Sequence, residues 1–478
     1  MAQIITAKKQ RLELAHILYQ HIDNYQNRYR LWAEHKKIVT DLLNCRTARL
    51  GGHIDRCDNC GSVRIIYHSC RNRHCPKCQT LAKQRWLERQ CADLLDIDYW
   101  HLVFTLPHEL NALAQGNPRV IYRLLFQSAS QTLLEFGRNP RWLGGELGIT
   151  MVLHTWGQKL DQHIHVHCVV TGGALSPDGQ RWLPAKKGFL FPTRALSKVF
   201  RGKYLDYLQQ SHAGGELRFG GSTTALADPG AFRLFLAKLK IHDWVVYAKP
   251  PFAGAAHVLA YLGRYTHRVA IANHRLVSFE DGEVRFRWRD YADGNKNKIM
   301  ALAGEEFIRR FLLHTLPTGF VRIRHYGLLG NRCRHTKLAR CRTLLSQPAP
   351  EPLPTAESAG EMMLRLAGIE HEHYYAEIIC GIATIFLVAR SLSARESGGH
   401  TAHDHLIGFR QVIAAHSFSW IGVQTMFVFF FIFLQSITSE LGADNLDLSF
   451  AEEKGFDAAK LGTCLQCGTC SSSCPTSF

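Results

Sequence analysis

Three histidines occupy alternate positions in one short stretch of the chain. His163, His165 and His167 are separated by single aliphatic residues, Ile164 and Val166. In a β-strand, residues two apart lie on the same face, so the imidazoles would share one face and the aliphatic side chains the other. Two or three imidazoles on a rigid strand suit a divalent metal ion. The alternative interpretation is an exposed strand that is merely rich in histidine.

Two tyrosines stand four residues apart in a segment with helical periodicity. Residues 255–269 predict a helix, on which Tyr261 and Tyr265 share one face and His257 lies one turn earlier. Taken alone, such a pair is more often explained by packing than by chemistry. The arginines and the histidine beside the second tyrosine make a chemical role worth considering.

The fifteen cysteines of a chain without a signal peptide point to metal sites rather than disulfides. Two CxxC pairs flank "SVRIIYHS", whose alternating β-branched residues predict a hairpin strand. Four thiolates gathered across a hairpin form a closed zinc site, which stabilises a module too small to fold on a hydrophobic core alone. Cys70 and His74 lie close by and could replace a ligand or complete a second site. The predicted zinc ligands are Cys57, Cys60, Cys75 and Cys78.

The segments around these residues predict an α+β protein. Residues 8–44 repeat apolar side chains at three-to-four spacing, as amphipathic helices do. From residue 100, strands and helices mix without the spacing of βαβ units, which favours an antiparallel sheet with helices packed on it. The histidine stretch is the second of two strands joined by the turn "WGQKLDQ". We therefore expect a helical and zinc-knuckle N-terminal module, then this sheet with its flanking helices, then a mostly helical tail.

Charge divides the chain into a basic body and an acidic tail. Residues 351–478 hold 6 Lys and Arg against 14 Asp and Glu, so the net charge of +17 divides into +25 for the first 350 residues and −8 for the rest. A strongly basic body favours a polyanionic partner, and nucleic acid is the first candidate. Because the first residues do not form a signal peptide, a cytoplasmic location is expected.

Five motifs resemble, in order along the chain, the two-tyrosine transposases of rolling-circle bacterial insertion sequences. That family belongs to the HUH endonuclease superfamily, named for a histidine, a hydrophobic residue and a histidine. The resemblance covers residues 12–342. The motifs are "SCRNRHCPKCQ", "VFTLPHEL", "WGQKLDQHIHVHCVVTGGAL", "YLGRYTHRVAI" and "RRFLLHTLPTGFVRIRHYGLLGN".

The resemblance implies an activity and places its residues. Such enzymes cut one DNA strand by tyrosine attack, which leaves a 5′-phosphotyrosine and a free 3′-hydroxyl. The HUH pair falls on His165 and His167, and the paired nucleophiles fall on Tyr261 and Tyr265. A divalent ion, Mg²⁺ or Mn²⁺, held by the histidines would polarise the scissile phosphate. The expected partner is DNA, as the single-stranded or hairpin ends of a mobile element.

The third metal ligand stays open on sequence grounds. His257 is the first candidate, because it shares the helix face of the tyrosines. His163 is the second, because it lies on the histidine strand, and His154, on the preceding strand, is the third. Four arginines are candidates for contacts with DNA phosphates: Arg264 and Arg268 beside the tyrosines, and Arg71 and Arg73 in the zinc motif.

Three other functions compete with a transposase. A plasmid replication initiator or relaxase would use the same HUH chemistry at an origin. A non-catalytic zinc-dependent DNA-binding protein would keep the histidines and tyrosines for structure alone, and an iron–sulfur electron carrier in a membrane would rest on the tail only. The sequence predicts no oligomeric state.

The sequence predicts a division of the chain into four parts. These are a helical and zinc-binding DNA-binding module at 1–95, an HUH catalytic domain at 96–345, a linker at 346–360 and an unrelated tail at 361–478.

The tail has features of its own. About twenty mostly apolar residues from Ser417 are enough to cross a bilayer, which would give a membrane contact through the tail. The last residues match the CxxCxxCxxxCP spacing of bacterial ferredoxins and resemble the start of a heterodisulfide-reductase-like cluster domain. We interpret the tail as a reading frame that runs into unrelated coding sequence, so no working iron–sulfur cluster is expected; a fused membrane or redox segment is the alternative. The four cysteines are Cys464, Cys467, Cys470 and Cys474.

Overall fold

Two compact units divide the chain, and most of the described residues belong to the first. The first unit comprises residues 1–52 and 67–355, and the second comprises 53–66 and 356–478. The computed structural model describes residues 12–56, 63–249, 263, 270–291, 293–350, 357, 361–362 and 365.

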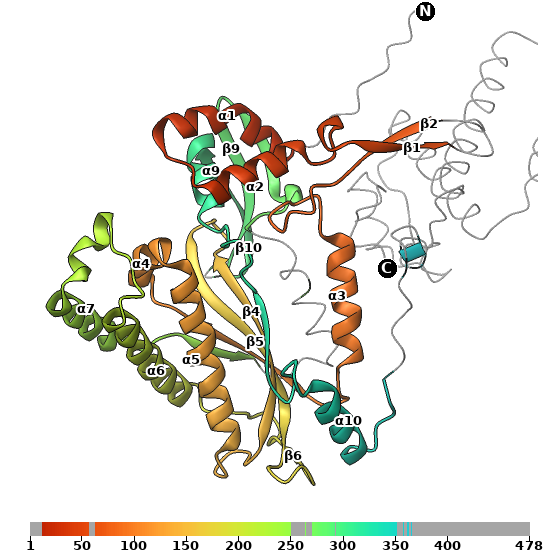
Figure 1. Cartoon of the computed structure of the whole chain (residues 1–478), viewed down its shortest axis with the longest axis vertical. Coiled ribbons are helices and arrows are strands. Elements are labelled where there is room, and N and C mark those ends of the chain that lie inside the picture. Colours follow the sequence, from red (N-terminus) through yellow and green to blue (C-terminus); the bar gives the residue numbers. More distant parts are fainter. Residues whose placement is uncertain are drawn as a thin grey trace, which may run out of the picture. The chain divides into compact units, whose positions relative to one another are not determined.

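A central antiparallel sheet organises the first unit (Figure 1). Its strands follow the order β11-β4-β5-β3-β7, and β6 pairs with the end of β5. The histidine strand β5 therefore lies at the centre, between β4 and β3, and each of these strands runs antiparallel to its neighbours. The strands are β3 (Tyr99–Thr105), β4 (Glu146–Trp156), β5 (Gln162–Leu175), β6 (Trp182–Pro184), β7 (Val246–Lys249) and β11 (Ile323–Gly327).

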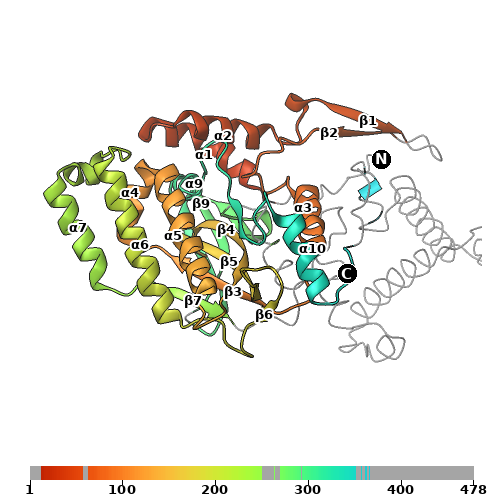
Figure 2. The ribbon, with the colours of Figure 1, turned by 60° about the horizontal axis from the view of Figure 1, so that its bottom comes forward.

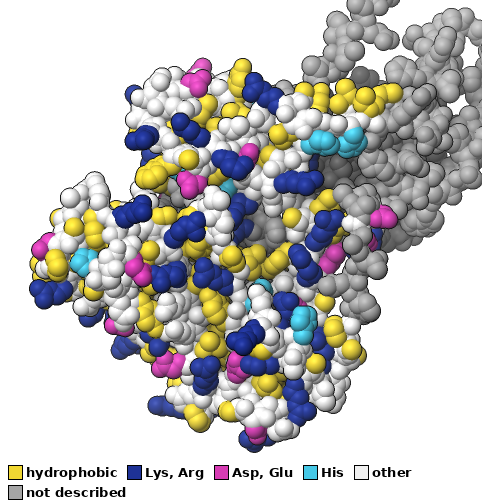
Figure 3. Space-filling model, in the orientation of Figure 1, with side chains coloured by type: hydrophobic (Ala, Val, Ile, Leu, Met, Phe, Trp, Pro, Cys, Tyr) yellow, Lys and Arg dark blue, Asp and Glu magenta, His cyan; other side chains and the backbone are white. Residues whose placement is uncertain are grey.

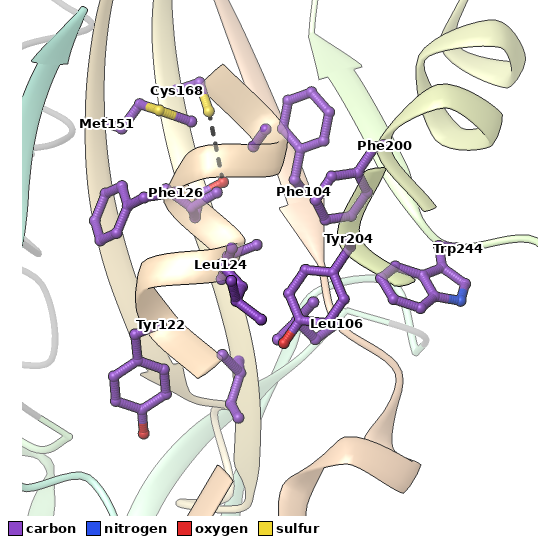
Figure 4. Close-up of a cluster of buried hydrophobic side chains, with 14 of the residues drawn as sticks. Phe104, Leu106, Tyr122, Leu124, Phe126, Met151, Cys168, Phe200, Tyr204 and Trp244 are labelled. Carbon is purple, nitrogen blue, oxygen red and sulfur yellow. Dashed lines mark hydrogen bonds between the residues drawn. The ribbon is translucent and has the colours of Figure 1, made fainter. Parts of the chain in front are cut away.

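Helices cover one face of this sheet and close the larger hydrophobic core. The even-numbered residues of β5, such as Val166 and Cys168, point into it. Figure 4 shows its aromatic centre, where Phe104 of β3 meets Phe200 of α6 with 5.0 Å between ring centroids. The alternation that predicts β5 therefore also decides which of its faces packs against the helices. The helices are α4 (Asn111–Gly116), α5 (Pro118–Arg138), α6 (Thr193–Ala213) and α7 (Pro229–Ile241).

A second core joins the N-terminal helices to a late part of the chain. Ile17 of α1 shares this core with Phe286 of β9 and Phe307 of α9. The strands β10-β9-β8 form a separate antiparallel sheet, and Figure 2 shows α1, α2 and α9 gathered beside it. The sequence did not predict this packing of the first helices on residues beyond 270. The elements are α1 (Leu14–Arg28), α2 (Ala33–Asn44), β8 (Leu276–Glu280), β9 (Glu283–Asp290), β10 (Lys296–Ala303) and α9 (Gly304–Leu312).

The remaining described elements are short helices and one hairpin. The strand predicted between the CxxC pairs is confirmed as β2, which pairs with β1. The mixture of helices and antiparallel strands confirms the predicted α+β class. The elements are β1 (Gly52–Arg56), β2 (Val63–Tyr67), α3 (Thr80–Ala92), α10 (Arg334–Leu344) and the 3-10 turns Ala48–Leu50, His108–Leu110, Gly221–Ala227 and Asn273–Arg275.

The predicted features of the tail lie outside the described residues. This holds for the apolar segment from Ser417 and for Cys464, Cys467, Cys470 and Cys474. Within the described part of the chain, no helix is long and apolar enough to span a bilayer.

Candidate metal centre and zinc cluster

Three histidines converge where β4 pairs with β5. The Nε2 atoms of His165 and His167 are 3.1 Å apart. His154 of β4 lies directly opposite His165 in the register, and one ring nitrogen from each of the three residues lies within 4.8 Å of the others. Two nitrogens bound at right angles to an ion at about 2.1 Å would stand roughly 3.0 Å apart. The donor set and its spacing therefore fit a divalent metal ion.

Hydrogen bonds at the opposite ring nitrogens orient two of these imidazoles. Nδ1 of His165 lies 2.8 Å from the carbonyl oxygen of His163, and Nδ1 of His167 lies 2.8 Å from Nε2 of His101 on β3. When Nδ1 of His165 and Nδ1 of His167 both donate, the Nε2 atoms of the two rings keep their lone pairs. Both lone pairs then point to the candidate metal position. The rings of His101 and His167 are also stacked, with 5.0 Å between centroids and 9° between planes.

Burial keeps the three imidazoles neutral. It lowers the pKa of His165 to about 3 and holds the pKa values of His154 and His167 well below their ordinary value. The proximity of the three rings adds to this effect, because a positive charge on one ring disfavours a charge on the next. Neutral imidazole is the form that binds a metal ion, so the site is ready for an ion at neutral pH without losing protons.

The structure ranks the candidates for the third ligand differently from the sequence. His154, the third candidate on sequence grounds, lies close to His165 and His167. His163 is exposed and is not a member of this group of histidines. His163 stands at the start of β5, where a bulge next to Trp156 interrupts the pairing with β4. Its backbone carbonyl supports the site, and its ring does not join the group. His257 lies outside the described residues.

Four cysteines form a second candidate metal site. Cys45 is the C-cap of α2, and the other three come from the segment before α3. Three sulfur–sulfur distances in the group are 3.3, 3.5 and 3.6 Å. Sulfurs bound at about 2.3 Å to a tetrahedral zinc ion stand roughly 3.8 Å apart, so this spacing fits structural zinc. Hydrogen bonding among the four thiols lowers the pKa of Cys45 and of Cys78 and raises the pKa of Cys70 and of Cys75. The group is Cys45, Cys70, Cys75 and Cys78.

This group differs from the one that the CxxC spacing predicts. Cys75 and Cys78 are members, but Cys45 and Cys70 complete the set of four. Four ligands are the number that a closed structural zinc site takes. Cys57 and Cys60 lie outside the described residues.

His74 and Arg73 connect the zinc segment to the loop after α9. Nε2 of His74 accepts the backbone N–H of Leu316 at 3.2 Å, and its Nδ1 lies 3.0 Å from Oδ1 of Asn72. Both ring nitrogens are thus engaged, and His74 is not a member of the group of four cysteines. Arg73 donates to the carbonyl of Phe320 at 2.8 Å, and its contact with DNA stays a prediction. Arg71 is exposed and stays a candidate for DNA binding.

The surface of the described body agrees with a polyanionic partner. On the face that Figure 3 shows, Lys and Arg side chains are spread widely and Asp and Glu side chains are few. The predicted nucleophiles Tyr261 and Tyr265 lie outside the described residues, as do Arg264 and Arg268. Their roles stay predictions.

Known proteins similar to this chain include two transposases. Residues 17–106 match the family described as "Transposase zinc-binding domain", and residues 148–337 match the family described as "Putative transposase". "Putative transposase y4qJ" of Sinorhizobium fredii (strain NBRC 101917 / NGR234) is 51% identical over 344 residues, which are 72% of this chain and 86% of that protein. "Transposase for insertion sequence element IS801" of Pseudomonas savastanoi pv. phaseolicola is 30% identical over 319 residues, 66% of this chain and 75% of that protein. A solved conjugative relaxase, TrwC with mutant oriT DNA, is 17% identical over 51% of this chain and 73% of that chain, with a TM-score of 0.21.

The zinc-binding segment and the domain match define the class of this protein as a transposase, with a histidine pair on the central strand of its antiparallel sheet. The chain belongs to the family of insertion-sequence transposases that includes the IS801 enzyme. Both relatives are named as transposases, so the replication initiator and the non-catalytic DNA-binding protein are no longer favoured.

Proposed function

We propose that this transposase cuts and rejoins single DNA strands through a 5′-phosphotyrosine intermediate. Tyr261 and Tyr265 would be the nucleophiles, and His154, His165 and His167 would hold Mg²⁺ or Mn²⁺. The convergence of two Nε2 atoms at 3.1 Å, with both Nδ1 atoms engaged by other partners, is the observation that supports this best. The proposed substrate is the single-stranded or hairpin end of the mobile element, processed in the cytoplasm.

The tyrosine conserves the energy of the phosphodiester. Its phenol loses a proton to solvent, and the phenolate oxygen forms a bond to the scissile phosphorus. The bond from phosphorus to the 3′ oxygen breaks, and this oxygen takes up a proton to become the free 3′-hydroxyl. A 3′-hydroxyl on another strand can later attack the phosphotyrosine, which releases the tyrosine and joins the strands. Two tyrosines four residues apart in the sequence would allow two such transfers in succession.

The chain prepares the histidine centre for an anionic substrate. The pairing of β4 with β5 fixes His154 opposite His165, and burial keeps both rings neutral, so neither is lost as a ligand at neutral pH. A divalent ion bound there would stabilise the negative charge that grows on the phosphate oxygens. Arg264 and Arg268 would hold the neighbouring phosphates.

Covalent adduct formation tests the nucleophiles and the ligands together. The full chain, incubated with single-stranded oligonucleotides and Mn²⁺, should give a protein–DNA adduct on a denaturing gel. Each single change, Tyr261→Phe or Tyr265→Phe, should leave an adduct on the other tyrosine, and the double change should leave none. His165→Ala should reduce the adduct by about 100-fold or more, because it removes a ligand.

The control for the ligand lies on the same strand. His163→Ala keeps the backbone carbonyl that orients His165, so it should leave adduct formation near the native level. An adduct that persists in the double tyrosine variant would contradict the assigned nucleophiles. Equal losses for His163→Ala and His165→Ala would contradict the assigned ligands.

The zinc-binding domain also has a proposed ligand set. Zinc itself is supported by the family match over residues 17–106. We propose Cys45, Cys70, Cys75 and Cys78 as its ligands, because their sulfurs stand at the spacing of a tetrahedral site.

A further inference from the structure

The small sheet β10-β9-β8 has one covered face and one open face. Val284 and Phe286 of β9 are buried in the second core, whereas the side chains that alternate with them are exposed. The residues of β10 that pair with those exposed positions are exposed as well. The open face consists of Arg285, Arg287, Arg289, Asn297, Ile299 and Ala301.

The open face is basic, and its arginines lie in a row. Arg285 pairs with Glu283 at one edge, but neither Arg287 nor Arg289 forms an ion pair with any carboxylate among the described residues. The nearby Asp290 and Asp293 are instead paired with Lys298. Arginines at alternate positions of a strand stand about 6.8 Å apart, so one extended nucleic-acid strand could place successive phosphates against them.

Apolar groups lie beside the arginines. Ile299 stands directly opposite Arg287 in the register and is 59% exposed. Tyr291, just beyond the end of β9, is 61% exposed. Bases of a single strand offer apolar faces that pack on such side chains, whereas a duplex hides those faces in its own stack. The mixture therefore fits single-stranded DNA better than a duplex.

Contacts tie this sheet to the histidine hairpin. Nε2 of Gln158, in the turn between β4 and β5, donates to Oη of Tyr291 at 3.2 Å. The Gln158 carbonyl accepts a hydrogen bond from Nη2 of Arg275 at 2.5 Å. Nζ of Lys159 lies 4.2 Å from the ring centroid of Trp288. The same turn joins the strand that carries His154 to the strand that carries the HUH pair. A DNA strand held on the open face would thus be held at a fixed place relative to the histidine centre.

We propose that the open face binds the single-stranded DNA that leads to or from the histidine centre. Phosphates meet Arg287 and Arg289, and bases pack on Ile299 and Tyr291. This contact serves the strand transfer proposed above, but it depends neither on the metal ion nor on the tyrosines. The open face thus binds the substrate strand at a distance from the reacting phosphate.

Salt-dependent binding tests the open face. The full chain is titrated with labelled oligothymidine, without added divalent metal, and fluorescence anisotropy is recorded over a series of KCl concentrations. The double variant Arg287→Gln/Arg289→Gln should lose affinity at low salt by about tenfold. Its slope of log K against log [salt] should be shallower by about 1.4, because each phosphate contact on a single strand contributes about 0.7. Arg287→Lys/Arg289→Lys keeps both charges and should keep the slope.

The matched control removes the same charge elsewhere. Arg194 and Lys198 are exposed on α6, and Arg194→Gln/Lys198→Gln should leave the slope unchanged. Equal slopes for the two glutamine pairs would overturn the proposal, as would a loss seen with duplex DNA only. The assay measures binding without cleavage, so a failure to form the covalent adduct would count against the proposed chemistry and not against this surface.

Discussion

His101 shows how one residue outside a ligand set can decide the chemistry of a ligand. Its Nε2 atom is 2.8 Å from Nδ1 of His167, and that contact selects the tautomer whose Nε2 faces the candidate metal position. Without this contact, the imidazole of His167 can take either tautomer, and its ring can rotate. We expect His101→Ala to weaken Mn²⁺ binding by about 10- to 100-fold, the usual effect of losing a partner behind a metal ligand. Isothermal titration of the full chain with Mn²⁺ measures this.

Two further changes at the same residue separate orientation from packing. His101→Gln can still accept the Nδ1 proton through its side-chain oxygen and should recover much of the affinity, whereas His101→Leu fills the space without an acceptor and should not. His242→Ala removes an exposed histidine elsewhere and should change nothing. Native Mn²⁺ affinity in His101→Ala would show that the contact has no part in metal binding.

At the scale of elements, local patterns were predictable and pairings between distant segments were not. Alternation alone predicts β5 and the face that packs against the helices, because a strand repeats every two residues. The position of His154 depends on the register across a turn and on the bulge beside it, which no spacing rule provides. Cys45 is brought to the zinc cluster by the end of α2, 25 residues before Cys70. The CxxC rule sees only neighbours in sequence, so it does not predict this candidate ligand.

The zinc cluster connects helix α2 to the segment before α3, and loss of Cys45 should release that connection. We expect Cys45→Ser to lower the zinc content per chain and the midpoint of thermal unfolding, because a structural zinc ion stabilises only the folded chain. Atomic emission spectroscopy and calorimetry measure the two effects. Cys91→Ser, an exposed position of α3, is the matched control. Should Cys57→Ser lose zinc while Cys45→Ser keeps it, the ligand set of the CxxC spacing would stand instead.

Over the first unit, the histidine hairpin contributes side chains to two different hydrophobic cores. Its strands contribute Leu153 and Ile164 to the core beneath the helices, and its turn contributes Leu160 to the core of α1, β9 and α9. His314 strengthens the contact of the turn with the second core. It is fully buried, and its Nε2 atom lies 3.2 Å from the carbonyl oxygen of Leu160. The two cores therefore fix the hairpin on which the proposed metal ligands stand.

This construction makes the stability of the first unit sensitive to acid. Burial lowers the pKa of His314 from 6.5 to about 4, of His325 to about 4 and of His74 to about 3. The unfolded chain takes up these protons below pH 6.5 and the folded chain does not, so the stability they contribute is complete above that pH and is lost towards pH 4. Each contributes a slope of up to about 1.4 kcal/mol per pH unit. In urea unfolding at a series of pH values, the free energy of unfolding should therefore fall steeply as the pH is lowered. His314→Gln should reduce the slope of this fall by up to about 1.4 kcal/mol per pH unit. The exposed His108→Gln serves as the control, and an equal slope in native chain and His314→Gln would mean that His314 is already protonated in the folded chain.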